Sequence, residues 1–184
     1  YAPKGIGALF IEEDLKEKIE PIVHGGSHEY GLRAGTENVP YIMGLKKACQ
    51  LIEKNLDSEA ERIGTLRDSF EEKILKEIPD TYVNGSRQNR VCNVSNITFK
   101  YVEGEALMAY ASDICCSAGS ACSSQSGDVS HVLKAIGTDP VDMHGAIRFS
   151  FGRFNAMNEV DTAVDLLRSS VEKLRKISPI YNTL

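Results

Sequence analysis

The sequence predicts a mixed α/β protein, with a first segment over residues 1–56 and an α+β domain over residues 57–184. Apolar and polar residues alternate in the second part as they do in half-buried strands. Other stretches of the same part repeat apolar residues at helical spacing. Because the strand patterns are few and short, we expect a small, mainly antiparallel sheet flanked by helices. The strand and helix patterns cover residues 96–102, 146–151, 58–78 and 160–174.

The first segment opens with "YAPKGIGALFI", whose apolar run over residues 6–11 is typical of a buried strand. A domain rarely begins inside a core strand, so we expect this polypeptide to be the later part of a longer protein or one piece of a split one. A short charged helix or turn follows, closed by Pro21. Residues 24–41 contain four glycines and no regular period, which predicts a long polar loop leading into a helix over residues 39–55.

The second part starts with the clearest helix, where Ser58 and Glu61 suggest a capping box and Pro79 ends the apolar stripe. The elements expected after it are strands at "TYVNG" and "NITFKYV", a helix at "EGEALMAYAS", a strand at "DICC", a cysteine loop, a helix at "SHVLKAIG" that ends at Gly137, a strand at "AIRFSFG" and a long final helix.

Composition limits the classes of function. The net charge is −5, which argues against a nucleic-acid surface. The sequence contains no run of eighteen apolar residues, so it predicts no membrane-spanning helix. Five cysteines are an odd number, and two of them, Cys115 and Cys116, are adjacent. This is a poor disulfide framework, so we expect reduced thiols in a cytoplasmic protein with no nucleic-acid or membrane partner.

Cys122 lies in "CCSAGSACSSQSG", where small residues surround it and no large side chain can bury it. We expect the loop over residues 117–127 to be mobile, because its composition offers few buried contacts. An exposed thiol in such a loop can act as a nucleophile and carry a group on its sulfur. An unimportant surface cysteine is the other interpretation, and spacing does not decide between them.

Thr36 lies in "GLRAGTEN", just before a predicted helix. Glycines and a hydroxyl at a helix N-terminus can bind a phosphate, although a plain helix cap with a glycine turn fits the same residues. Arg148 lies in the otherwise apolar "AIRFSFG", where burial would be costly without a partner. Its planar guanidinium matches either an internal carboxylate or the carboxylate of a substrate.

These motifs together resemble the C-terminal half of a cysteine desulfurase of the pyridoxal-phosphate-dependent class V aminotransferase family. Most of the chain carries the resemblance, through "YAPKGIGALF", "HGGSHEYGLRAGTEN", "YVEGEAL", "SAGSACSS", "HVLKAIG" and "IRFSFGRF". The long, serine-rich cysteine loop resembles the iron–sulfur-assembly branch. The resemblance implies that residues 1–56 are the end of the large cofactor domain. Residues 57–184 then form the small C-terminal domain that carries the mobile cysteine loop.

The resemblance also implies a role for each candidate residue. Cys122 matches the cysteine that takes sulfur from L-cysteine as a persulfide and passes it to an iron–sulfur scaffold or another acceptor protein. Arg148 matches the arginine that binds the substrate carboxylate. Thr36 matches the threonine that reaches across a homodimer to the phosphate of the partner's pyridoxal 5′-phosphate. No residue is assigned to a metal.

The family's Schiff-base lysine lies in a Ser-x-His-Lys stretch just before the Tyr-x-Pro-Lys-Gly run, which here is residues 1–5. Lys4 belongs to that run and is not the cofactor lysine. We therefore expect this chain to need a missing N-terminal half and to be inactive alone. The alternatives are a selenocysteine lyase, a sulfur-carrier or binding module without a cofactor, and a metal site made of Cys92, Cys115, Cys116 and Cys122, whose spacing fits zinc poorly.

Overall fold

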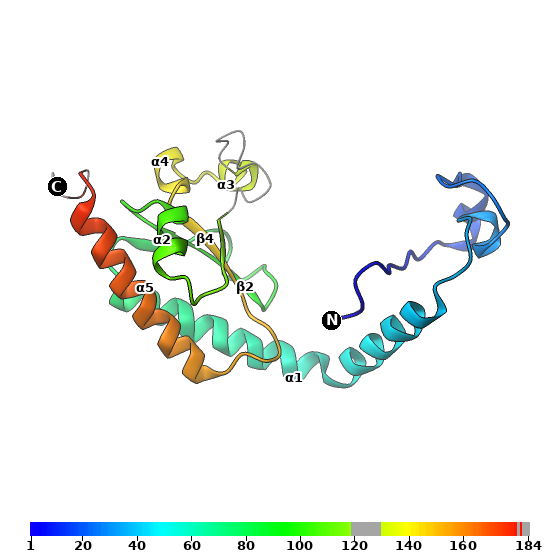
Figure 1. The fold of residues 1–184 in the computed structure, drawn as a ribbon, viewed down its shortest axis with the longest axis horizontal. Helices are drawn as coiled ribbons and strands as arrows, with labels where there is room; N and C mark the ends of the chain where they lie inside the picture. The colour runs from blue at the N-terminus through cyan, green and yellow to red at the C-terminus, as the bar shows by residue number, and fades with distance from the viewer. Residues whose placement is uncertain (119–129, 180, 182–184) are drawn as a thin grey trace. The chain divides into compact units, whose positions relative to one another are not determined.

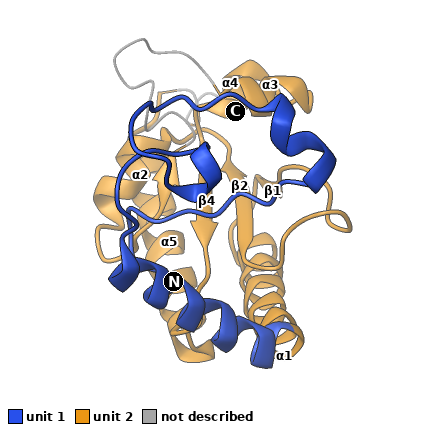
Figure 2. Ribbon diagram, turned by 90° about the vertical axis from the view of Figure 1, so that its right-hand side faces the viewer, with its two compact units in different colours: residues 1–56 blue, residues 57–184 orange. Residues whose placement is uncertain are grey.

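The computed structural model describes residues 1–118, 130–179 and 181, and the chain divides into two compact units, Tyr1–Leu56 and Asp57–Leu184 (Figures 1 and 2). Each unit is described by itself. The elements in chain order are the 3₁₀ helices η1 (Glu13–Lys18) and η2 (Glu29–Gly31), α1 (Val39–Glu77), β1 (Thr81–Val83), β2 (Val94–Phe99), α2 (Gly104–Tyr110), β3 (Ser117–Ala118), α3 (His131–Ala135), α4 (Pro140–Met143), β4 (Ala146–Ser150) and α5 (Met157–Ile177).

The strand predicted over residues 6–11 is absent from the described structure. Leu9 and Phe10 are 79% and 87% exposed. A strand needs a neighbour for its backbone hydrogen bonds, and every strand pairing among the described residues joins two of β1 to β4. The opening segment packs closely on α1 at another position. A Cβ atom on Gly44 would lie 2.5 Å from Pro3 Cγ, so the opening segment packs against the helix where only glycine fits.

Helix α1 is continuous where the sequence predicts two helices. It begins at Val39 as expected, but Ser58 lies inside it and forms no helix cap. No glycine or proline interrupts the chain between Gly44 and Gly64, so nothing forces a break there. The Asn55 side chain donates to the Leu51 carbonyl at 3.1 Å, which satisfies it within the helix. The predicted capping box is therefore wrong.

A four-stranded sheet, all of whose strand pairs are antiparallel, forms the centre of the second unit in the order β1-β2-β4-β3. The last strand is Ser117–Ala118 rather than the predicted "DICC", because the chain makes a turn in which the Ile114 N–H donates to the Ala111 carbonyl. Ser117 and Ala118 are the residues that reach β4, opposite Arg148 and Ile147.

One face of this sheet packs on the main core, which includes apolar side chains of α1, α2 and α5. Ile97, Phe99, Ile147 and Phe149 are the strand residues of that core. The other face is covered only in part. Leu133 of α3 and Met143 of α4 pack with Ala146 at one end of β4. Thr98 is fully buried as well, so β2 is more deeply buried than the half-buried strand that its alternation predicts.

Buried polar groups join these elements. Glu71 of α1 accepts two hydrogen bonds from Arg90, at 2.6 and 2.8 Å, and a third from the Ser95 hydroxyl at 2.6 Å. Arg175 of α5 donates to the carbonyl oxygens of Pro79, Asp80 and Lys100. These contacts satisfy backbone carbonyls at the turns that flank β1 and β2. None of the helices among the described residues is long and apolar enough to cross a membrane.

Candidate functional site

Cys122 lies outside the described residues, as do residues 119–129 as a whole. The structure does fix the two residues that border this segment. Ala118 ends β3, where it lies opposite Ile147 of β4. Ser130 caps α3 by accepting a hydrogen bond from the Leu133 N–H at 3.4 Å. The predictions for Cys122, its nucleophilic role and the mobility of its loop, therefore stay predictions.

Arg148 lies in the middle of β4 and is exposed, not buried as the apolar strand pattern suggested. Side chains alternate between the two faces of a strand, and Ile147 and Phe149 occupy the core face. No hydrogen bond or ion pair joins the Arg148 guanidinium to another residue that the structure describes. The internal carboxylate that would satisfy a buried arginine is thus not found among these residues.

Arg148 is the centre of a row of polar side chains that crosses three strands. It lies opposite Asn96 of β2 on one side and opposite Ser117 of β3 on the other. Residues directly opposite each other in an antiparallel sheet point to the same face. The Asn96 Oδ1 accepts a hydrogen bond from Asn84 Nδ2 at 2.6 Å, and Asn84 Nδ2 also donates to the Thr98 hydroxyl at 2.8 Å. The sheet therefore presents a donor-rich row at the point where β3 leads toward Cys122.

Thr36 is exposed in the polar loop of the first unit. Interactions on both sides hold the backbone around it. Arg33 Nη1 donates to the Gly35 carbonyl at 2.9 Å, and His28 Nδ1 lies 3.1 and 3.2 Å from the carboxylate oxygens of Glu37. Glu37 accepts hydrogen bonds from its own backbone N–H and from His28, which together hold its carboxyl pKa below the ordinary value. Gly35 has φ of 96°, a conformation that favours glycine.

The start of α1 is partly capped already. Asn38 accepts hydrogen bonds from the Tyr41 N–H, through both its side chain and its carbonyl. The group that Thr36 can offer to a phosphate is thus its own hydroxyl, which has no hydrogen-bond partner among the described residues. Thr36 belongs to the first unit and Arg148 to the second.

The described cysteines sit in different surroundings. Cys49 and Cys115 are exposed. Cys92 and Cys116 are partly buried, and Cys116 packs at the edge of the main core. Burial raises the pKa of the Cys116 thiol, with a smaller contribution from Cys115. Within residues 1–118, 130–179 and 181, no three side chains of His, Cys, Asp or Glu gather into a group that could hold a metal ion.

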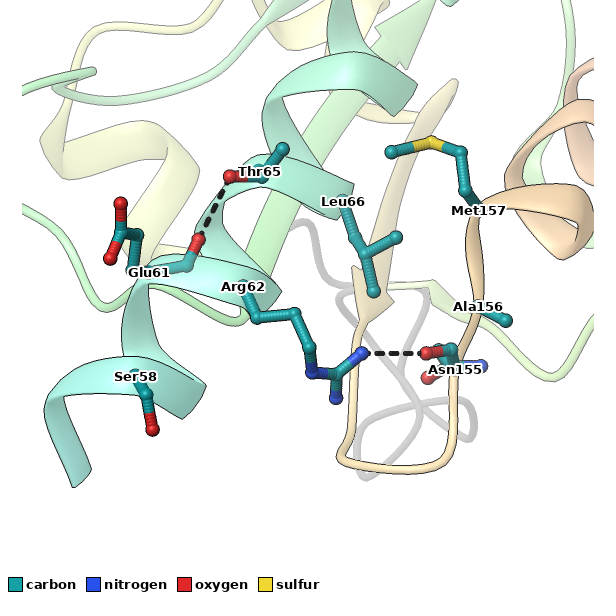
Figure 3. A pocket seen from close by; sticks show the side chains of 8 residues that line it. All are labelled: Ser58, Glu61, Arg62, Thr65, Leu66, Asn155, Ala156 and Met157. Atoms are coloured by element: carbon teal, nitrogen blue, oxygen red, sulfur yellow. Dashed lines mark hydrogen bonds between the residues drawn. The ribbon is translucent and has the colours of Figure 1, made fainter. Parts of the chain in front are cut away.

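An open pocket lies between α1 and the start of α5 (Figure 3). Arg62 projects into it and donates to the Asn155 carbonyl at 2.9 Å and to the Arg153 carbonyl at 3.0 Å. Glu59 accepts further hydrogen bonds from the same guanidinium. Because these contacts hold the turn before α5, we interpret the pocket as structural. Its lining residues are Ser58, Glu61, Arg62, Thr65, Leu66, Asn155, Ala156 and Met157.

Sequence reasoning missed the polar contacts around two of the candidates. The sequence predicts Asn96 at the start of one strand and Asn84 near the end of another, and neither pattern indicates that their side chains meet. The pair between His28 and Glu37 was missed because the two residues are nine positions apart in an irregular loop. A strand period gives the face of Asn96, but the partner across the sheet depends on the register, which no local pattern specifies.

A family model described as aminotransferase class-V matches residues 1–163. Curated relatives include "Cysteine desulfurase IscS" from Histophilus somni (strain 129Pt), 44% identical over 182 residues, which are 99% of this chain and 45% of that protein. The protein of the same name from Haemophilus influenzae (strain PittEE) is 43% identical over the same shares. The chain therefore spans about 45% of the length of the curated relatives that it matches.

Solved structures with the same fold include a protein titled "NifS-like protein", with a TM-score of 0.74 and 27% identity over 84% of this chain and 40% of that one. A structure titled "SspA in complex with cysteine" has a TM-score of 0.59 and 30% identity, covering 84% and 42% of the two chains. A cysteine desulfurase from Thermococcus onnurineus NA1, at 21% identity and a TM-score of 0.75 over 94% and 44%, is alike in fold. These likenesses confirm the predicted fold class.

Proposed function

The chain belongs to the aminotransferase class-V family, and on that premise we propose that it is the C-terminal portion of a cysteine desulfurase of the iron–sulfur-assembly branch. The whole protein takes sulfur from L-cysteine as a persulfide on Cys122, releases L-alanine, and passes the sulfur to an acceptor protein. One observation carries the proposal beyond the sequence likeness. Arg148 presents a guanidinium without a partner among the described residues, on the strand next to β3, from which the chain continues toward Cys122.

Arg148 binds the substrate carboxylate in this proposal. A guanidinium forms two parallel hydrogen bonds to a carboxylate, and its charge is permanent. An arginine that already paired with an internal acid would not be available for this task. The exposure of Arg148 and the polar Asn96 beside it support the role.

Cys122 carries the sulfur. It follows Ala118 by four residues, a segment that can span at most about 14 Å, and Ser117 lies directly opposite Arg148. The Cys122 thiolate attacks the sulfur of the bound cysteine. A sulfur–sulfur bond forms while the carbon–sulfur bond breaks, and the electron pair of that bond stays on carbon, which takes a proton to become the methyl group of alanine.

The family's cofactor, pyridoxal 5′-phosphate, supplies the electron sink for this bond cleavage when it is bound. Thr36 fits its phosphate group, because the side chain is exposed and the hydroxyl donates to no other described residue. Thr36 serves the cofactor of the partner subunit in a homodimer. Lys4 lies in the turn before Gly5, whose φ is 91°, and is not the lysine that holds the cofactor. This chain is then inactive alone.

The test compares the complete protein with this chain by itself. With pyridoxal phosphate and L-cysteine, the complete protein should release equal amounts of alanine and sulfide in the presence of a thiol reductant, and the isolated chain should release neither. Selenocysteine tested in parallel separates a selenocysteine lyase from a desulfurase. A complete protein that releases no alanine, or an isolated chain that does, contradicts the proposal.

The variant Arg148→Lys in the complete protein tests the proposed role of Arg148. Lysine keeps the charge but loses the planar pair of donors, so the KM for cysteine should rise about tenfold or more while the Kd for pyridoxal phosphate stays the same. Unchanged KM and kcat would mean that Arg148 does not contact the substrate.

A further inference from the structure

Asn96 is the direct neighbour of Arg148 on the open face of the sheet. The register places Asn96 of β2 opposite Arg148 of β4. Opposite residues in an antiparallel pair have Cβ atoms about 4.5–5.5 Å apart and point to the same side. The Arg148 guanidinium is on a long, flexible stem and can therefore bring a small group that it binds beside the Asn96 side chain.

The hydrogen bonds of Asn96 fix the orientation of its amide. Its Oδ1 accepts from Asn84 Nδ2 at 2.6 Å, and Asn84 directly follows β1. The strand order β1-β2-β4 puts Asn84 and Arg148 on opposite sides of β2. With its oxygen engaged by Asn84, the Asn96 amide keeps the two N–H donors of Nδ2 for an acceptor on this face.

The Asn84 amide also contacts two threonines. Its Nδ2 donates to the Thr98 hydroxyl at 2.8 Å, and its Oδ1 accepts from the Thr138 hydroxyl at 3.4 Å. Thr98 is fully buried, so this end of the network is shielded from water. These contacts hold the Asn84 side chain in place beside Asn96.

The result is two sets of donors without an acceptor. Neither Asn96 Nδ2 nor the Arg148 guanidinium has a hydrogen-bond partner among the residues that the structure describes. Ser117, on the other side of Arg148, donates its hydroxyl to the Ala118 carbonyl at 3.1 Å. None of the other residues that the register places on this face of β2 and β4, Val94, Thr98, Ala146 and Ser150, is acidic.

We propose that Asn96 binds the substrate carboxylate together with Arg148. This inference rests on the proposed function, and it assigns a second residue to the recognition of the amino acid. Two donors side by side, one of them cationic, match the two oxygens of a carboxylate. Asn84 is a positioning residue, which donates to the Asn96 oxygen and leaves the Asn96 N–H groups for the substrate.

The decisive variant is Asn96→Asp in the complete enzyme. Aspartate has nearly the same shape and still accepts the hydrogen bond from Asn84, but it replaces the N–H donors with a negative oxygen. The probes are 3-mercaptopropionate, which has the carboxylate, and its neutral amide, 3-mercaptopropionamide. Calorimetry should show that the Kd for 3-mercaptopropionate rises about tenfold or more, because a hydrogen bond to a charged group is lost. The Kd for the amide should change little.

Ser117→Ala is the matched control, because Ser117 lies in the same row but its hydroxyl is already used. The affinity of this variant for 3-mercaptopropionate should stay within about twofold of the wild type, and Asn96→Ala should fall between the control and Asn96→Asp. An unchanged affinity in Asn96→Asp, or an equal loss in Ser117→Ala, overturns the role of Asn96. If the wild-type enzyme releases no alanine from cysteine, the proposed function fails, and the carboxylate probe still tests the Asn96 and Arg148 pair.

Discussion

The two units of the chain differ in how far they can bury their own apolar residues. No residue of Tyr1–Leu56 is buried, although this unit contains apolar side chains such as Phe10 and Ile22, which are 87% and 96% exposed. All the buried apolar residues belong to Asp57–Leu184, where α1, α2, α5 and the sheet enclose one main core. The first unit thus consists of loops, short 3₁₀ helices and about half of α1, and the buried apolar residues are confined to the second unit.

Because of this difference, the candidate residues of the two units are held in place by different kinds of contact. Arg148 and Asn96 lie on a sheet whose other face is packed on the main core, so their positions depend on contacts within the second unit. Thr36 depends on a few exposed polar contacts made by Arg33, His28 and Glu37. Exposed ion pairs contribute little to stability, so we expect the Thr36 loop to be held less firmly than the sheet that carries Arg148 and Asn96.

The largest expected difference is between two phenylalanines. Phe99→Ala removes a fully buried ring from the core and should lower the free energy of unfolding by about 3–5 kcal/mol. Phe10→Ala changes an exposed side chain and should alter it by at most about 0.5 kcal/mol. Urea unfolding of the isolated chain, followed by circular dichroism, measures both. Equal losses would show that the first unit has a core of its own.

A smaller difference is expected between two ion pairs. Arg90→Met leaves the Glu71 carboxylate, which is 3% exposed, without its counter-charge and should destabilise the second unit by about 3 kcal/mol. The loss should not be larger, because the Ser95 hydroxyl still donates a hydrogen bond to Glu71. His28→Gln breaks an exposed pair and should cost much less than Arg90→Met does. The same unfolding experiment would contradict this if His28→Gln proved the more damaging change.

The carboxyl of Glu37 offers a test by pH. Its pKa is lowered in the folded chain, so any stabilisation from this group is present above its unfolded pKa and is lost as the pH falls through the folded value. An NMR titration should give a midpoint below 4.5. In His28→Gln the midpoint should rise but stay below the ordinary value, because the backbone N–H of Glu37 still donates. A midpoint that His28→Gln leaves unchanged would show that the pair does not form in solution.

The smallest expected effect concerns the adjacent cysteines. Burial raises the pKa of Cys116, so less of it is thiolate near pH 8, and Cys115 is exposed. In Cys115→Ser the remaining Cys116 should react with iodoacetamide several-fold more slowly than Cys115 does in Cys116→Ser. Mass spectrometry with fragmentation of the peptide around residue 115, which also contains Cys122, gives the rate at each cysteine. Equal rates would mean that this edge of the core opens readily.

The sequence predicted the second unit better than the first, for a physical reason. The periods over residues 96–102, 146–151 and 160–174 arise from faces that pack on the core of this same chain, and the structure has β2, β4 and α5 there. The run over residues 6–11 has the composition of a strand but no strand beside it among the described residues. Composition indicates that a segment is suited to burial. Whether the segment is buried depends on a neighbouring strand or helix that packs against it.

The candidate site was predicted by residue type but not by environment. Arg148 was expected to be buried because its neighbours are apolar, yet alternation turns it to the open face. The Ser58 capping box failed because its residues also tolerate the interior of α1. The orientation of Asn96 depends on Asn84, twelve positions away, and on the register of three strands. Long-range contacts of this kind leave no local pattern in a sequence.

The most direct test of the account is the location of the transferred sulfur. The complete protein, loaded with pyridoxal phosphate, is given one equivalent of L-cysteine without a reductant or an acceptor and is then digested and examined by mass spectrometry. Fragmentation of the peptide that holds Cys115, Cys116 and Cys122 should place one added sulfur atom on Cys122, with one alanine released, and neither product should appear in Cys122→Ser. Added sulfur on Cys92 or Cys115 instead, or normal alanine release by Cys122→Ser, would contradict the proposed function.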